Sequence, residues 1–130
     1  METKNVALER RGVTKTFVSV VANKNVDLTV YSGEILAILG ENGSGKTSLM
    51  NTIAGIYYPD EGSIFVNGVE ANIRSPKDAF HYGIGMIHQH FKLVDVFSAV
   101  DNIILGVKDD ASGFNRKKQA QKVVSLAEKY

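Results

Sequence analysis

The sequence contains no cysteine, which excludes both a disulfide framework and a thiolate metal site. Its 15 basic and 14 acidic residues nearly cancel, so there is no broad positive field to attract nucleic acid or an anionic membrane. Long hydrophobic runs are also missing, because the central apolar stretch Ile35–Leu39 is far shorter than the roughly 20 residues of a membrane-spanning helix. The start of the chain, Met1–Asn5, leads into no signal-peptide core. These absences favour a soluble protein of the reducing cytosol, with any anion site confined to a local motif.

Strands are predicted in the first third of the chain. Val6–Val13 and Asn25–Val30 alternate partly between apolar and polar residues, as strands with one buried face do. Glu34–Leu39 is apolar on both faces after its first residue, which predicts a strand buried in the middle of a sheet. Ile84–His88 is the next candidate strand.

A hairpin and four helices complete the expected elements. Ser63–Val66 leads into Asn67-Gly68, a pair that accepts the positive φ angles of a tight hairpin turn. Ser75 and Pro76 are typical of a helix start, and Gly55 and Gly83 of helix ends. The predicted helices span Lys46–Ala54, Pro76–Tyr82, Ser98–Leu105 and Arg116–Tyr130, the last with an apolar stripe at helical spacing.

A glycine-rich segment between the expected buried strand and the first helix matches the phosphate-loop pattern G-x-x-x-x-G-K-[ST]. Its residues are Gly40, Glu41, Asn42, Gly43, Ser44, Gly45, Lys46 and Thr47. The glycines let the backbone curl so that successive N–H groups point inward, and the following helix presents its positive end to the same place. The alternative, a glycine-rich turn with an exposed lysine, is disfavoured by the flanking strand and helix.

Three residues of the loop and helix have distinct expected roles. The Lys46 ammonium should reach the β and γ phosphates of a nucleotide, and the Thr47 hydroxyl should bind Mg²⁺. Ser48 is a further candidate contact of a phosphate. The loop alone leaves GTPases, kinases and many ATPases open, so the surrounding residues must choose between these classes.

Three further features resemble the ATP-binding cassette family over essentially all 130 residues. Upstream, Lys15-Thr16-Phe17 is similar to the family's aromatic loop, and the resemblance makes Phe17 the platform for adenine. Without that resemblance, a lone Phe is more often a core residue. Downstream of the loop, Leu49–Gly55, Pro59–Ile64 and Asn67-Gly68 are similar to the family's helix, turn and strand, which we interpret as scaffold.

The third feature is a segment similar to the family's Q-loop, Gly85-Met86-Ile87-His88-Gln89-His90-Phe91. The resemblance implies that Gln89 reaches Mg²⁺ and the attacking water, which makes Lys46 and Gln89 the expected catalytic residues.

His88 and His90 lie two residues apart, but no third ligand of matching kind follows nearby, so neutral imidazoles are favoured over a metal site. Within the family, this segment and Asp101–Gly106 resemble the importers of simple sugars and nucleosides, although Asp95-Val96-Phe97 replaces a segment in which many relatives carry a proline.

The expected fold is α/β, a P-loop NTPase core with a partly parallel sheet, an antiparallel β subdomain and the start of a helical subdomain. By resemblance, residues 1–130 form the N-terminal part of an ATP-binding domain, in which the family's serine-glycine-glycine signature, acidic strand and switch histidine are missing. Ser112–Asn115 is not that signature, and Asp109-Asp110 follows no long apolar strand. Because phosphoryl transfer needs several groups at once, we expect these residues alone to bind nucleotide weakly and not to hydrolyse it.

The resemblance implies that the full-length protein is an ATPase that drives uptake of a sugar or nucleoside. Its implied partners are ATP, Mg²⁺, transmembrane permease subunits and a second nucleotide-binding domain, which places it in the cytoplasm at the inner face of the membrane. The alternative is a non-transport ATPase with the same head, acting on chromosomes or in translation. Its partner would be nucleic acid, against which the near-neutral charge argues. A small GTPase or a nucleotide kinase is disfavoured by the β-rich segment before the loop.

Overall fold

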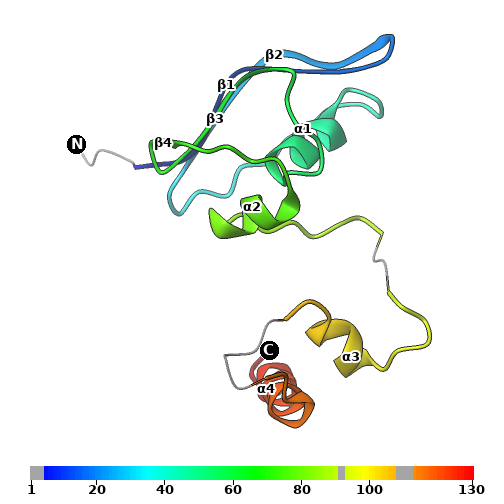
Figure 1. Ribbon diagram of the computed structural model, residues 1–130. Helices are drawn as coiled ribbons and strands as arrows, with labels where there is room; N and C mark the ends of the chain where they lie inside the picture. Colours follow the sequence, from blue (N-terminus) through cyan, green and yellow to red (C-terminus); the bar gives the residue numbers. More distant parts are fainter. Residues whose placement is uncertain (1–4, 91–92, 108–112) are drawn as a thin grey trace. The chain divides into compact units, whose positions relative to one another are not determined.

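The computed structural model describes residues 5–90, 93–107 and 113–130 (Figure 1). Phe91, Asp109, Asp110 and Ser112, which entered the sequence interpretation, lie outside the described residues. The chain divides into two compact units, residues 1–87 and 88–130.

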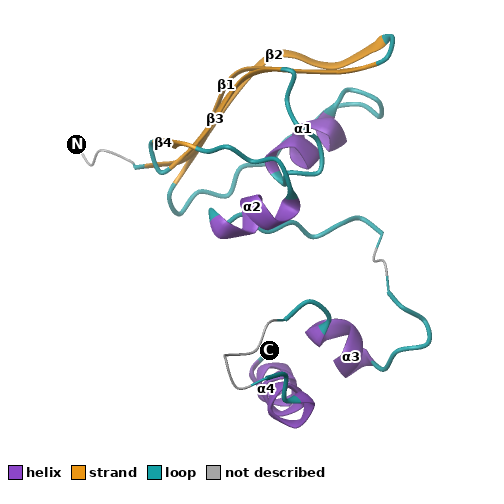
Figure 2. Ribbon diagram, viewed as in Figure 1, coloured by secondary structure: helices purple, strands orange, loops and turns teal. Residues whose placement is uncertain are grey.

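The first unit contains an antiparallel sheet with the strand order β2-β1-β3-β4, drawn in orange in Figure 2. The strands are β1 (Val6–Phe17), β2 (Val20–Tyr31), β3 (Glu61–Val66) and β4 (Val69–Glu70). The two strands predicted in the first third are confirmed, but both are longer than expected. They join in a hairpin whose last pair is Phe17 with Val20, so the turn consists of Val18 and Ser19, with Val18 at φ 47°.

Local turn and cap signals in the sequence are confirmed by the backbone. Asn67 and Gly68 have φ angles of 49° and 79°, and they connect β3 to β4 through the pair Val66–Val69. The Ser75 side chain accepts a hydrogen bond from the Asp78 amide at the start of α2 (Pro76–His81). Each of these features depends on residues within four positions of one another, which is why the sequence alone predicts them.

The core of this unit lies between the sheet and the segment that runs into α2. It is formed by buried apolar side chains: Val13, Ile64, Val66, Ala71, Ile73 and Ala79. Helix α1 (Lys46–Ile53) buries Leu49, Thr52 and Ile53. Figure 2 shows α1 and α2 on the same side of the sheet.

The prediction of parallel strands over Glu34–Leu39 and Ile84–His88 is wrong for this structure. Both segments are without strand pairing, and Ile35 and Leu39 are 99% and 92% exposed. A strand that is apolar on both faces is stable only with hydrogen-bonded neighbours beside it and cover above and below. Among the described residues, no strand lies beside Glu34–Leu39, so most of its apolar side chains face solvent.

Arg10 is a buried cation within the apolar face of the sheet. It lies opposite Leu28 on β2 and Ile64 on β3, and it is 1% exposed. None of its three guanidinium nitrogens has a hydrogen-bond partner among the described residues. Burial lowers the pKa of Arg10 to about 10, because the charged form loses its hydration without gaining a partner.

Replacing Arg10 by Met should stabilise the first unit. The change removes an unpaired buried charge and retains apolar volume, so we expect the free energy of unfolding to rise by ~1–4 kcal/mol. Urea denaturation followed by circular dichroism measures the change. Arg11→Met is the matched control, because Arg11 is exposed and paired with Glu9 at 2.8 Å; a stabilisation of equal size in both variants would contradict the interpretation.

The second unit contains α3 (Ala99–Ile104) and α4 (Arg116–Lys129), each slightly shorter than predicted. Arg116 connects them through two hydrogen bonds to the Asp101 carboxylate, of 2.7 and 3.1 Å. The apolar stripe of α4 is largely exposed, with Val124 at 52% and Tyr130 at 91%. Among the described residues, none of the helices combines the length and apolar character that crossing a membrane requires.

Acid should loosen the second unit through Asp101. Hydrogen bonds from Arg116 and then from Ser98 lower the pKa of Asp101 from its ordinary 3.8 to about 2. A carboxylate with a lowered folded pKa contributes stability that is complete above its unfolded pKa and is lost as the pH falls through the folded one. Helicity at 222 nm should therefore fall between pH 4 and pH 2 in the natural chain. Asp101→Asn should remove this step and Glu128→Gln should not; a step of the same size in Asp101→Asn would refute the assignment.

Candidate functional site

The glycine-rich loop lies between the exposed Glu34–Leu39 segment and α1. Gly43 and Gly45 have φ angles of 82° and 88°, a region that side-chain-bearing residues rarely adopt. The Ser44 amide donates to the Glu41 carbonyl oxygen at 3.2 Å, which closes the turn. The glycines therefore allow the loop to fold back over the start of the helix.

The N-terminus of α1 is open to an anion. Its first intrahelical bond runs from the Leu49 amide to the Gly45 carbonyl oxygen, so the amides of Lys46, Thr47 and Ser48 have no partner within the helix. No acidic residue lies in the first turn and no side chain caps it. Positive partial charge at this end of the helix is therefore not neutralised locally, which suits a phosphate group.

Lys46 extends across the loop. Its ammonium donates to the carbonyl oxygens of Gly40 and Glu41 at 2.6 Å each, and to the Ser44 hydroxyl at 3.2 Å. These three bonds use all three of its donors. A phosphate that binds here must take over at least one of them, so the ammonium is already held beside the amides that would contact the same ligand.

The donors of the loop suit a polyphosphate and Mg²⁺. Backbone amides and one ammonium supply positive charge, and Thr47, which is exposed in the first turn of α1, supplies a hydroxyl oxygen. Mg²⁺ in proteins prefers a few oxygen ligands together with phosphate oxygens and water, so one hydroxyl beside a phosphate cradle is an appropriate donor. Ser48, the neighbouring hydroxyl, is half-buried.

The loop is fixed to the hairpin of the sheet at Gly45. A Cβ on Gly45 would lie 2.3 Å from the carbonyl oxygen of Ala22 on β2, so only glycine fits. Beside it, the buried Asn23 side chain donates to the Gly45 carbonyl oxygen at 3.2 Å. Strand β2 thus packs directly against Gly45, the residue at which the loop ends and α1 begins.

Phe17 lies at the end of β1, next to the hairpin turn, and is 37% exposed. Its ring contacts Tyr57, with centroids 4.8 Å apart and planes at 74°. The hairpin that carries Phe17 is the same one that packs against Gly45. The first unit therefore brings the expected base platform and the expected phosphate loop onto one connected framework.

Gln89 belongs to the second unit, whereas Lys46 and Thr47 belong to the first. It lies in an exposed bend between His88 and His90, so its expected role at Mg²⁺ stays a prediction. Within the described part of the chain, no group of three or more metal-ligating side chains comes together.

The sequence alone assigned no role to Asn23 or Tyr57. It indicated only a scaffold role for Asp60, which lies in Pro59–Ile64. An amide at a strand position beside Val20-Val21-Ala22 is the signal that could have drawn attention to Asn23. Tyr57 and Asp60 carry no such signal, because they contact Phe17 and Lys15 across 40 or more residues of sequence. Such contacts are set by the tertiary fold.

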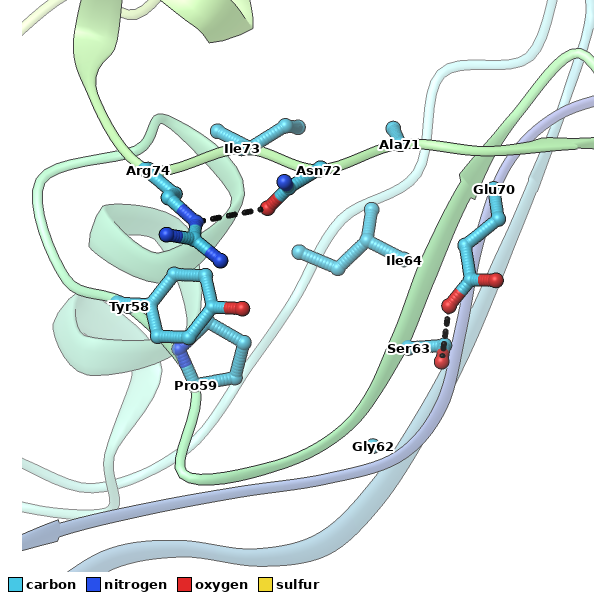
Figure 3. Close-up of a pocket in the computed structure, with 10 residues that line it drawn as sticks. All are labelled: Tyr58, Pro59, Gly62, Ser63, Ile64, Glu70, Ala71, Asn72, Ile73 and Arg74. Atoms are coloured by element: carbon cyan, nitrogen blue, oxygen red, sulfur yellow. Dashed lines mark hydrogen bonds between the residues drawn. The ribbon is translucent and has the colours of Figure 1, made fainter.

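A separate hollow of about 380 Å³ lies at the edge of the sheet (Figure 3). The Arg74 guanidinium lies over the Tyr58 ring at 5.4 Å and donates to Asn72 at 3.2 Å. Across the hollow, Ser63 donates to Glu70 at 2.7 Å. No residue of the glycine-rich loop lines it, so it is distinct from the candidate site.

Residues 23–129 match the model of the family described as ABC transporter. The guanosine import ATP-binding protein NupO of Bacillus subtilis is 46% identical over 124 residues, which are 95% of this chain and 24% of that protein. The nucleoside import ATP-binding protein NupA of Lactococcus lactis is 48% identical over 120 residues, covering 91% and 24%. The ribose import ATP-binding protein RbsA of Caldanaerobacter subterraneus is 52% identical over 99 residues, covering 76% and 20%.

Solved structures with a similar fold are also ATP-binding cassettes. A nucleotide-free cassette from an ABC transporter has 26% identity and a TM-score of 0.72, with 88% of this chain and 44% of the cassette covered. A dimeric cassette in a post-hydrolysis state, bound to ADP and Pi, has 29% identity and a TM-score of 0.70, with 93% and 57% covered. The expected fold class is thereby confirmed. The chain spans about a quarter of the length of the first two of these curated relatives, at 24% each.

Gly45→Ala should damage the site far more than Gly43→Ala. Both glycines have positive φ, but a Cβ on Gly43 meets nothing within 4 Å, whereas one on Gly45 collides with Ala22. We expect Gly43→Ala to cost ~1–2 kcal/mol of backbone strain and Gly45→Ala a further ~1–3 kcal/mol of overpacking. Thermal denaturation of the two variants measures the difference. Equal stabilities would show that the close approach to β2 does not constrain the loop.

Proposed function

The chain belongs to the ABC transporter family, and we propose that its Gly40–Thr47 loop binds the phosphates of ATP in the ATP-binding subunit of an importer. The observation that carries the proposal is the open N-terminus of α1 beneath the Lys46 ammonium. Amide donors and a full positive charge converge there, and no acidic side chain in the first turn of the helix competes for them.

Each site residue has a proposed part in holding the nucleotide. The backbone of residues 40–45 and the amides of Lys46 and Thr47 would surround the phosphates, and the Lys46 ammonium would bind the β and γ groups. Ser48 would supply a further contact. Phe17 would stack on adenine, a contact that tolerates any purine and therefore supports affinity more than choice of base.

Mg²⁺ is the proposed metal, with the Thr47 hydroxyl and the Gln89 side-chain oxygen as protein ligands. When bound, the metal neutralises charge that develops on the transferred phosphoryl group. Gln89 is uncharged, so it can join or leave the metal at small electrostatic cost, and it is proposed as the residue that connects the nucleotide to a partner subunit. Lys46 and Gln89 are the proposed catalytic residues of the full-length ATPase, and residues 1–130 would form the N-terminal part of its ATP-binding domain.

Uptake of a nucleoside or sugar is the proposed role of the whole protein, because three similar proteins are named as guanosine, nucleoside and ribose import ATP-binding proteins. Dimeric cassettes among the similar structures support a second nucleotide-binding domain as a partner. The protein would lie in the cytoplasm at the inner face of the membrane, attached through permease subunits. The alternative, an ATPase acting on nucleic acid, gains no support from these relatives.

An apolar groove in the second unit is the proposed contact for the permease. It has a volume of about 540 Å³ and is lined mainly by Leu93, Val94, Phe97 and Ile103. The Asn102 side chain shapes the groove through two hydrogen bonds to the Val94 backbone. Its Oδ1 accepts from the Val94 amide at 2.8 Å, and its Nδ2 donates to the Val94 carbonyl oxygen at 3.2 Å. A short amphipathic helix of a membrane subunit is the kind of partner that fits such a groove.

Lys46→Ala should weaken ATP binding by about 10- to 100-fold, since a charge-assisted hydrogen bond contributes ~1.5–3 kcal/mol. Isothermal titration of the 130-residue chain with ATP and Mg²⁺ measures the effect. Lys122→Ala, on the exposed surface of α4, is the matched control and should bind as the natural chain does.

The same chain should release no phosphate above the buffer rate. Steady-state release that disappears in Lys46→Ala would contradict this expectation. Equal ATP affinity in Lys46→Ala and the natural chain would contradict the proposed site itself.

A further inference from the structure

The turn that follows α1 is attached to the end of β1, directly before Phe17. The Asp60 carboxylate accepts a hydrogen bond from the Thr16 amide at 2.7 Å and pairs with the Lys15 ammonium at 3.0 Å. The Asp60 amide donates to the Thr14 carbonyl oxygen at 2.9 Å. One residue thus holds three consecutive positions of the strand that ends in Phe17.

These bonds also position the side chains around the Phe17 ring. The Lys15 ammonium lies 5.3 Å from the centroid of the ring, where a cation is attracted by the π system. The Lys15 side chain is only 15% exposed, so Asp60 holds it in this place rather than in solvent. On the same turn, Tyr57 makes the 4.8 Å aromatic contact with Phe17.

Restraint of this kind matters because the hairpin tip has little other support. Val18 in the turn is fully exposed, and Val20 and Val21 are 62% and 53% exposed. The hydrogen bond from the Thr16 amide and the bond from the Lys15 ammonium lower the pKa of Asp60, because both stabilise the ionised carboxylate that makes the attachment.

We propose that Asp60 is a positioning residue for the nucleotide base: it fixes Lys15 and Thr16 so that the Phe17 ring is held ready to stack on adenine. The inference rests on the proposed ATP site and extends it. Because Asp60 follows the helix that begins at the phosphate loop, a single segment then sets both the phosphate cradle and the base platform. The turn, interpreted from the sequence as scaffold, becomes part of the binding site.

Comparison of ATP with inorganic tripolyphosphate isolates this role, because tripolyphosphate carries the phosphates without a base. Asp60→Ala should lower the affinity for ATP by about 5- to 10-fold, the lower part of what stacking of one base contributes. Its affinity for tripolyphosphate should stay unchanged. Asp60→Asn keeps an acceptor for the Thr16 amide and should retain most of the preference for ATP.

Asp27→Ala is the matched control. The Asp27 carboxylate also accepts a hydrogen bond from the backbone of β1, from the Gly12 amide at 2.6 Å, but far from Phe17. It should leave the ratio of the two affinities as in the natural chain. Loss of affinity for both ligands by the same factor in Asp60→Ala, or of neither, would overturn the inference while leaving the ATP site intact.

A second readout needs no nucleotide. The sequence has no tryptophan, so Phe17→Trp places a single tryptophan probe at the platform. Adding Asp60→Ala should lower its anisotropy and shift its emission to the red, and adding Asp27→Ala should not. Unchanged emission would refute the positioning role. Absence of ATP and tripolyphosphate binding in the natural chain would instead contradict the proposed function, and the inference with it.

Discussion

The close approach of Gly45 to the carbonyl oxygen of Ala22 is the contact on which the candidate site depends. It sets the angle at which the loop enters α1, and with it the direction of the amides at the N-terminus of the helix. The hairpin that makes this contact also carries Phe17 at its end. Movement of the hairpin would therefore disturb both parts of the site, which explains why glycine and the buried Asn23 side chain meet at this point.

Two cations in the first unit show how local the electrostatics are. Lys46 satisfies its three donors on the loop and lies where an anion can reach it, so its charge is available at small cost. Arg10 lies on β1 in the apolar face of the sheet without a hydrogen-bond partner among the described residues, and there its charge opposes folding. With a formal net charge of only +1, attraction of a nucleotide must come from the loop and not from the whole surface.

The turn from Tyr57 to Asp60 shows that a scaffold motif and a binding motif can be the same residues. Its sequence predicts only a turn. In the structure, however, Asp60 binds Lys15 and Thr16 of β1, and Tyr57 contacts the Phe17 ring. Rigid attachment of a binding ring reduces the entropy that a ligand must otherwise overcome on binding. The sheet and the helix thus contribute to the site through their connections as well as through the loop itself.

Features that depend on neighbouring residues follow from the sequence alone: the phosphate-loop pattern, the Asn67-Gly68 turn, the Ser75 cap and the family. Contacts between distant residues, such as Gly45 with Ala22 and Asp60 with Thr16, depend on the tertiary fold. The structure also overturned the expected strand over Glu34–Leu39. Periodicity reports how a segment could be buried, whereas a strand forms only where another strand supplies hydrogen bonds, and that partner is not encoded in the segment.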